Sequence, residues 1–310
     1  MSTFHIYSNT DKGVLPHIQP NDKLNDPQLY VPSKGLMAAV NVALQLNQPL
    51  LLTGEPGTGK TQLAHHIAYH FDLGAPLIFN AQTTSQAKDL FYRYDALAHF
   101  QFAQTQKEPL TDEEVERRFI RYHGLGKAIQ SNRKAVVLLD EIDKAPRDFP
   151  NDILAAIENL EFEVPEIGKP PYKATAENRP IIIMTSNSEK NLPDAFLRRV
   201  VYFNILFPEK EELLRIVSSK VEGYNAQQLD ALIAHFEEIR SGKTVKMRKN
   251  PATAELINWA SLLKKANFPA EKINDPEDLS KDERAFLIQS YSVLAKNRDD
   301  LKDIQKMVRG

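Results

Sequence analysis

The stretch LLLTGEPGTGKTQLA, from Leu50 to Ala64, decides the fold. A short apolar run, typical of a buried strand, leads into a turn with three glycines and a proline, and a helix-like pattern follows. The segment Gly54–Thr61 fits the pattern G-x-x-x-x-G-K-[ST] in the strand, turn and helix context that the pattern requires. Glycines let successive backbone N–H groups surround phosphate oxygens, and the helix N-terminus adds partial positive charge. The stretch therefore predicts a nucleotide phosphate site.

The residues of this glycine-rich loop have distinct expected roles. Lys60 is placed to neutralise the β and γ phosphates, and the Thr61 hydroxyl to hold Mg²⁺. The alternative is a glycine-rich turn with an incidental lysine, which the flanking strand and helix disfavour. The expected nucleotide contacts are Gly54, Glu55, Pro56, Gly57, Thr58, Gly59, Lys60, Thr61 and Gln62.

A second motif, AVVLLDEIDKAP, starts at Ala135. An apolar strand that ends at Asp140 puts a carboxylate at the C-terminal edge of a parallel sheet, where it can bind the magnesium shell. The next residue, Glu141, is placed to polarise an attacking water, which points to hydrolysis. Two acids after a strand are often only a helix start, but their combination with the glycine-rich loop favours the catalytic interpretation.

Three further stretches supply weaker candidates. Asn187 ends the strand IIIMTSN and can contact the γ-phosphate or orient the water, although asparagine at a strand end is also common turn chemistry. Asn80 closes the strand LIFN in a similar way. Arg198 and Arg199 follow LPDAFL, and guanidinium groups suit a developing phosphoryl charge, although ordinary ion pairs use the same residues.

Composition excludes several classes of function. The chain of 310 residues has 39 Lys and Arg against 41 Asp and Glu, so its net charge of −2 gives no general attraction to nucleic acid or anionic membranes. It contains no cysteine, which excludes disulfides, thiolate catalysis and cysteine-based metal sites. The start MSTFHIYSNTDKG lacks the features of a signal peptide, and no apolar run approaches membrane-spanning length. We therefore expect a cytoplasmic protein with no membrane partner.

The pattern of apolar residues changes along the chain. Short apolar strand candidates alternate with helical segments up to Phe207, as in a parallel sheet covered on both faces. Pro32 and Ser33 mark the start of the first helix. After Phe207 only helical periodicity remains, with Trp259 expected in the core. The strand candidates are 50–53, 77–79, 135–139, 181–185 and 200–204.

In this order, GEPGTGKT, LLDEIDKAP, TSN and LPDAFLRR resemble the AAA+ ATPases, and specifically the MoxR-like branch. The resemblance implies an α/β fold, namely a P-loop NTPase αβα sandwich with a parallel sheet followed by an all-helical AAA+ lid domain, with ATP bound between the two. It further implies the following roles: Lys60 and Thr61 bind phosphate and Mg²⁺, Asp140 binds Mg²⁺, Glu141 is the catalytic base, Asn187 is sensor 1, and Asn80 occupies the glutamate-switch position.

Two positions depart from the family pattern. Many relatives have Asp-Arg-Phe where this chain has Arg198-Arg199-Val200, so Arg199 aligns with the trans-acting arginine and Arg198 is a second candidate for that role. The position of the sensor 2 arginine falls on Pro251, which leaves Arg248 in the preceding loop as the candidate contact with the γ-phosphate.

The resemblance also implies a domain organisation. We expect an N-terminal arm at 1–31, a nucleotide-binding core at 32–207 and a helical lid at 208–310. Within the core, a helix 2 insertion is expected at about 82–127 and a hairpin before sensor 1 at about 161–180.

The activity implied by the family is ATP hydrolysis that drives chaperone-like remodelling of a protein, often a von Willebrand A domain partner, by a hexameric ring. One alternative is a nucleic-acid-directed motor or restriction-type subunit, which the near-neutral charge disfavours. The other is a nucleotide-switch scaffold without hydrolysis in a defence or signalling complex, which the intact Asp140-Glu141 pair disfavours. The preference for ATP over GTP follows from the family alone.

Overall fold

The computed structural model describes residues 7, 14–15, 17, 21–105, 109–187, 192–242 and 247–309. The chain divides into two compact units, which we call the helical unit and the sheet unit. The helical unit comprises the described parts of Met1–Val31, Glu55–Gly59 and Leu206–Gly310, and the sheet unit those of Pro32–Gly54 and Lys60–Ile205. The tip of the glycine-rich loop, Glu55–Gly59, thus groups with the helical unit.

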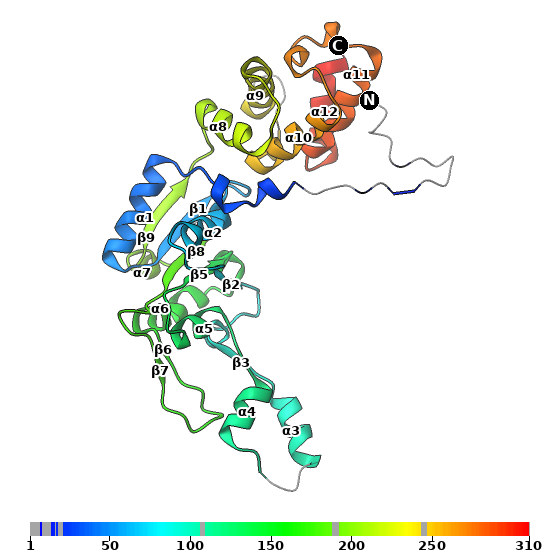
Figure 1. Ribbon diagram of the computed structural model, residues 1–310. Coiled ribbons are helices and arrows are strands. Elements are labelled where there is room, and N and C mark those ends of the chain that lie inside the picture. The colour runs from blue at the N-terminus through cyan, green and yellow to red at the C-terminus, as the bar shows by residue number, and fades with distance from the viewer. Residues whose placement is uncertain are drawn as a thin grey trace. The chain divides into compact units, whose positions relative to one another are not determined.

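The sheet unit contains a parallel sheet of five strands in the order β2-β5-β8-β1-β9 (Figure 1). This confirms the expected fold class. The central strands are buried, but the edge strands alternate, with Ile78 and Tyr202 each 42% exposed. An edge strand has a neighbouring strand on one side only, so part of its surface stays accessible to solvent. The side chains of β2 and β9 are therefore less buried than their apolar sequences predicted. The strands are β1 (Leu50–Gly54), β2 (Leu77–Asn80), β5 (Val136–Asp140), β8 (Ile181–Thr185) and β9 (Val201–Ile205).

Helices flank this sheet. Ser33 caps the first of them, α1, because its hydroxyl accepts a hydrogen bond from the Leu36 N–H at 3.2 Å, as the sequence predicts. Helix α1 packs against β9, α2 against β5 and α5 against β2. The helices of the unit are α1 (Lys34–Leu46), α2 (Lys60–His70), α3 (Ala96–Thr105), α4 (Asp112–Phe119), α5 (Gly124–Gln130), α6 (Phe149–Asn159) and α7 (Asp194–Leu197), with 3₁₀ turns η3 (Ala87–Leu90) and η4 (Ile142–Lys144).

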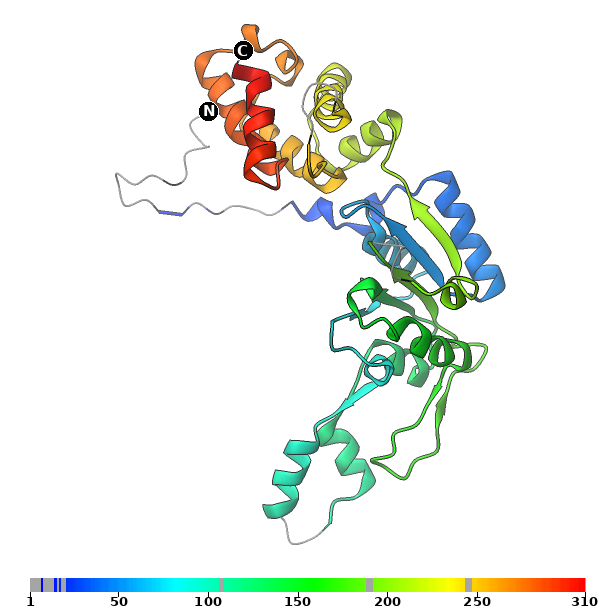
Figure 2. The same cartoon turned by 180° about the vertical axis from the view of Figure 1, so that it is seen from behind.

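Two segments extend from the main sheet, in the regions where an insertion and a hairpin were expected. The first is an antiparallel pair, β3 (Tyr92–Tyr94) and β4 (Ile120–Tyr122), which carries α3 and α4. The second is the hairpin of β6 (Glu161–Phe162) and β7 (Tyr172–Lys173). Glu116 of α4 links the two, since it accepts a hydrogen bond from the Tyr172 hydroxyl at 2.9 Å, and both views show the hairpin approaching α4 (Figure 2).

The helical unit has its own apolar core, in which Trp259, Phe236 and Tyr291 are fully buried. The N-terminal arm joins this unit: Lys220 of α8 donates hydrogen bonds to the carbonyl oxygens of Lys23 and Leu24, at 3.0 and 2.8 Å. Within the described residues, no helix is both long and apolar enough to span a membrane. Its helices are α8 (Lys210–Lys220), α9 (Ala226–Ser241), α10 (Thr253–Lys265), α11 (Lys281–Ser290) and α12 (Arg298–Arg309), with 3₁₀ turns η1 (Asp22–Leu24), η2 (Pro27–Leu29), η5 (Ala270–Lys272), η6 (Pro276–Asp278) and η7 (Tyr291–Val293).

His235 makes the stability of the helical unit depend on pH. Its side chain lies in the core, 2.7 Å from the Tyr291 hydroxyl and 3.1 Å from the Asn274 Oδ1, and burial lowers its pKa below the usual value. Because the unfolded chain takes up a proton at this residue below about pH 6.5 and the folded chain does not, we expect the free energy of unfolding to fall as the pH drops below that value.

The slope of the free energy of unfolding against pH that His235 contributes approaches about 1.4 kcal/mol per pH unit. Urea denaturation between pH 5 and 8 measures it. The His235→Gln variant should lose this component, whereas His70→Gln, at an exposed position of α2, should retain it. Equal slopes in both variants would contradict the assignment.

Candidate nucleotide site

Three neighbouring strands of the sheet unit end at the same edge. They are β5, β8 and β1, which end at Asp140, Thr185 and Gly54. Because all strands are parallel, the residues at and just beyond their C-terminal ends meet there, which is where open α/β sheets bind ligands. We call this the phosphate edge.

Asp140 is held by two hydroxyl groups at the phosphate edge. Thr61 Oγ1 lies 3.1 and 3.3 Å from the two carboxylate oxygens, and the buried Thr185 hydroxyl donates to Oδ1. The structure therefore brings together the two residues expected to hold Mg²⁺. A hydroxyl and a carboxylate are the hard oxygen donors that Mg²⁺ prefers, and such sites complete their coordination with water and substrate phosphates.

Lys60 is only 7% exposed and donates a hydrogen bond to the Gly54 carbonyl oxygen at 2.8 Å. Its ammonium group is thus held beside the start of the glycine-rich loop. Gly54 itself has a φ of 139°, and a Cβ there would lie 2.4 Å from the Ile205 carbonyl oxygen, so only glycine fits. Gln62, the third residue of α2, is half-buried.

Glu141 follows Asp140 with the unusual left-handed φ of 56°. Its N–H donates to Thr185 Oγ1 at 2.9 Å, which turns the residue away from the strand direction. The carboxylate pairs with Lys144, and this hydrogen bond raises the pKa of Lys144. Asn187 reaches the same carboxylate, with Nδ2 3.5 Å from Glu141 Oε1. The structure therefore brings the expected base and the expected sensor together.

Asn80 lies beside these residues without bonding to Glu141. It pairs in register with Asp140 across β2 and β5, and its side chain is exposed. Among the described residues, the hydrogen-bond partners of the Glu141 carboxylate are Lys144 and Asn187. Control of Glu141 by Asn80 stays a prediction.

Arg198 and Arg199 lie near the N-terminal ends of the strands, opposite to the phosphate edge. They follow α7 and precede β9, so a five-residue strand, roughly 16 Å long, separates them from the phosphate edge of the same unit. Arg198 is exposed, and Arg199 Nε lies 3.4 Å from the Glu158 carboxylate in a pair with both side chains about half exposed. The sheet unit does not bring them to its own Lys60 and Asp140.

The loop tip Glu55–Gly59 packs within the helical unit. A Cβ on Gly57, whose φ is 79°, would meet the Ala252 Cβ at 2.8 Å, so a larger residue would collide with the start of α10. Thr58 Oγ1 donates to the Glu55 carbonyl oxygen at 2.8 Å and closes the turn, while Pro56 is exposed.

Arg240 of α9, like Thr185 of β8, was not predicted as a site residue from the sequence. Its side chain, 12% exposed, pairs with Glu55 of the loop tip at 2.5 Å, donates to the Pro251 carbonyl oxygen at 2.7 Å and stacks 3.6 Å above the Phe207 ring centroid. Arg248 instead pairs with Asp299 of α12 at 2.9 Å. Within the helical unit, the arginine next to the loop tip is therefore Arg240, which no motif identifies because it sits inside an ordinary helix.

Comparison with known proteins agrees with this geometry. Residues 49–200 match the AAA domain (dynein-related subfamily), which supports an AAA+ ATPase and nucleotide binding by this part of the chain. No curated protein matches the chain. Among solved structures, NtrX from Brucella abortus in complex with ADP is similar, with 16% identity over 92% of this chain and 70% of that one. Its TM-score of 0.43 is too low for the likeness to bear on function.

The Thr185 hydroxyl should stabilise the phosphate edge measurably. Replacing it with the isosteric valine removes the donor to the Asp140 carboxylate and the acceptor for the Glu141 N–H. We expect Thr185→Val to lower the free energy of unfolding of the sheet unit by about 1.5–3 kcal/mol, the scale of a hydrogen bond to a charged group. Chemical denaturation measures the change. Thr185→Ser, which retains the hydroxyl, is the control, and equal losses in both variants would contradict the role of the hydroxyl.

Proposed function

We propose that the protein is a magnesium-dependent ATPase of the AAA+ class and of MoxR type, which works as a ring to remodel a protein partner. The observation that carries the ATPase assignment is the meeting of Lys60, Thr61, Asp140 and Glu141 at the phosphate edge. The match of residues 49–200 to the AAA domain supports it independently of the geometry.

The chemistry follows from the charges of these residues. Lys60 would neutralise the β and γ phosphate oxygens while the loop N–H groups bind them. Thr61 and Asp140 would hold Mg²⁺, which would help to neutralise the charge of the nucleotide phosphates. Glu141 would accept the proton of the attacking water, and Asn187, which already contacts this carboxylate, would fix the water between them.

The position of the two arginines supports the proposed assembly into a ring. A developing charge on the γ-phosphate is commonly stabilised by an arginine, but Arg198 and Arg199 lie at the edge of the sheet opposite to their own phosphate edge. An arginine exposed there can serve the site of a neighbouring copy. We infer that complete sites form between subunits, and six is the number that the family resemblance implies.

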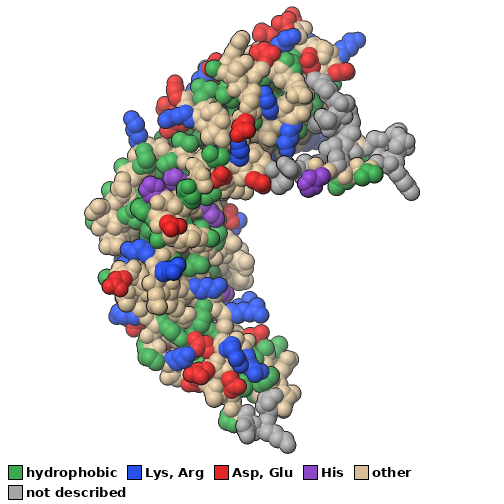
Figure 3. Space-filling model, viewed as in Figure 1, with side chains coloured by type: hydrophobic (Ala, Val, Ile, Leu, Met, Phe, Trp, Pro, Cys, Tyr) green, Lys and Arg blue, Asp and Glu red, His purple; other side chains and the backbone are tan. Residues whose placement is uncertain are grey.

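A protein partner is supported by the insertion on β3 and β4. Leu97 and Phe100 of α3 are 67% and 62% exposed, and neighbouring exposed apolar side chains favour contact with another protein. On the face shown in Figure 3, Lys and Arg side chains are interspersed with Asp and Glu, unlike the continuous basic surface of a nucleic-acid motor. A von Willebrand A domain protein is the partner class that the family resemblance suggests.

Two substitutions separate nucleotide binding from hydrolysis. Lys60→Ala should weaken ATP binding at least tenfold, because it removes charge-assisted hydrogen bonds to phosphate. Glu141→Gln should bind ATP with unchanged affinity but turn it over at least a hundredfold more slowly. Calorimetry measures the binding and phosphate release the turnover. Glu163→Gln, an exposed carboxylate replaced in the same way, is the control. Normal turnover by Glu141→Gln would refute the proposed mechanism.

Mixing experiments test the role of the arginines in trans. A variant that carries both Arg198→Ala and Arg199→Ala should lack turnover, and so should Lys60→Ala. Mixed subunits pair an intact phosphate edge from the first variant with intact arginines from the second, so part of the ATPase activity should return. Mixtures as inactive as their components would show that the arginines act within their own subunit or not at all.

A further inference from the structure

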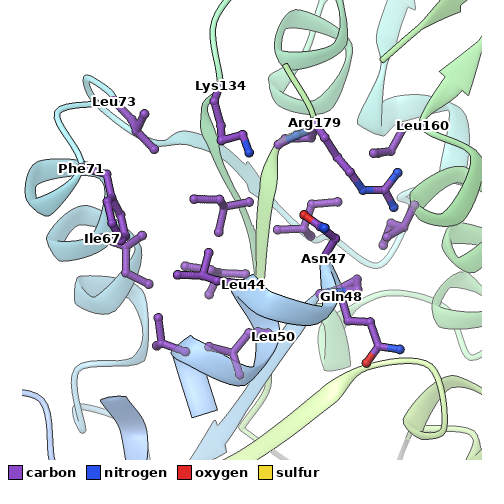
Figure 4. A pocket seen from close by; sticks show the side chains of 18 residues that line it. Leu44, Asn47, Gln48, Leu50, Ile67, Phe71, Leu73, Lys134, Leu160 and Arg179 are labelled. Carbon is purple, nitrogen blue, oxygen red and sulfur yellow. The ribbon is translucent and has the colours of Figure 1, made fainter. Parts of the chain in front are cut away.

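A cavity of about 390 Å³ lies in the sheet unit, at the edge of the sheet opposite to the phosphate edge (Figure 4). The first residues of β1 and β8, Leu50 and Ile181, line it together with parts of α1 and α2. Since β1 and β8 run from the cavity to the phosphate edge, roughly 16 Å of strand separates the two places. The cavity is therefore not part of the proposed ATP site.

The cavity is mostly apolar. Its volume falls within the range of about 300–1,000 Å³ that is usual for small-molecule sites. Apolar lining residues of this kind favour an apolar ligand group such as an alkyl chain. Each methylene that the cavity removes from water strengthens binding about fourfold. Its apolar lining residues include Leu44, Leu50, Ile67, Phe71, Leu73 and Leu160.

Two basic residues line the cavity beside these apolar side chains. Lys134 lies just before β5 and Arg179 just before β8, and both line the cavity. Figure 4 shows both residues in the upper part of the view. No Asp or Glu is among the residues that line the cavity. Neither cation forms an ion pair with another residue in the part of the chain that the structure describes. The amide side chains of Asn47 and Gln48 add further hydrogen-bonding groups.

We propose that this cavity binds a small amphipathic acid, with its apolar chain among the leucines and its carboxylate at Arg179 and Lys134. Arg179 is half-buried, so its charge is less screened by solvent than that of the exposed Lys134. A guanidinium binds a carboxylate through two parallel hydrogen bonds, which makes Arg179 the main determinant for the acid group. A neutral apolar molecule would leave both cations without a counter-charge.

Calorimetry with hexanoate, octanoate, 1-octanol and octylammonium tests the ligand class with the full chain. Octanoate should bind about sixteenfold more tightly than hexanoate, because it buries two more methylenes. It should bind at least tenfold more tightly than 1-octanol. Octylammonium should not bind. Octanol or octylammonium binding as tightly as octanoate would overturn the proposal, and so would no binding of octanoate.

Variants locate the site. Arg179→Gln should weaken octanoate binding at least tenfold, whereas Arg133→Gln, which removes an exposed charge outside the cavity, should leave it unchanged. Ala43→Leu, which fills the cavity from α1, should abolish binding while circular dichroism shows an intact fold. Octanoate affinity should be the same with and without saturating ATP. Unchanged binding in Arg179→Gln, or displacement of octanoate by ATP, would overturn the assignment without bearing on the ATPase function.

Discussion

The Asp140 carboxylate, held by the hydroxyls of Thr61 and Thr185, is the contact on which the proposed site depends. It joins the first turn of α2 to the ends of β5 and β8, so Lys60 and Thr61 are held close to the acidic pair within the sheet unit. The constraint behind it is the parallel order β5-β8-β1, which makes three strand ends neighbours. A half-buried carboxylate is stabilised by partners of this kind, because a charge that is partly removed from water without hydrogen bonds would be costly.

The same contact fixes the geometry of Glu141. Thr185 receives the Glu141 N–H while it donates to Asp140, and the left-handed backbone at Glu141 directs the carboxylate toward Asn187. One threonine therefore orients both acids. Strained backbone conformations such as the left-handed φ of Glu141 occur often at active sites, where they orient a functional side chain.

The sequence predicted the parts of the molecule that have strong local signals. Gly54–Thr61 and the apolar runs that became β1, β5 and β8 have patterns with few structural alternatives, and the Ser33 cap is a local hydrogen bond. The edge strands β2 and β9 were predicted to be more buried than they are, because a one-dimensional pattern does not show the order of strands in a sheet. Arg240 and Thr185 were missed because their importance comes from partners far away in the chain, Glu55 and Asp140.

The most direct test of the proposed site is the binding of Mn²⁺, a substitute for Mg²⁺, in equilibrium dialysis with the slowly hydrolysed analogue ATPγS. If Asp140 and Thr61 form the metal site, the protein should retain one Mn²⁺ per chain with the nucleotide and little without it. The Asp140→Asn variant should lose most of this binding. Retention of Mn²⁺ by Asp140→Asn at the level of the parent protein would contradict the account.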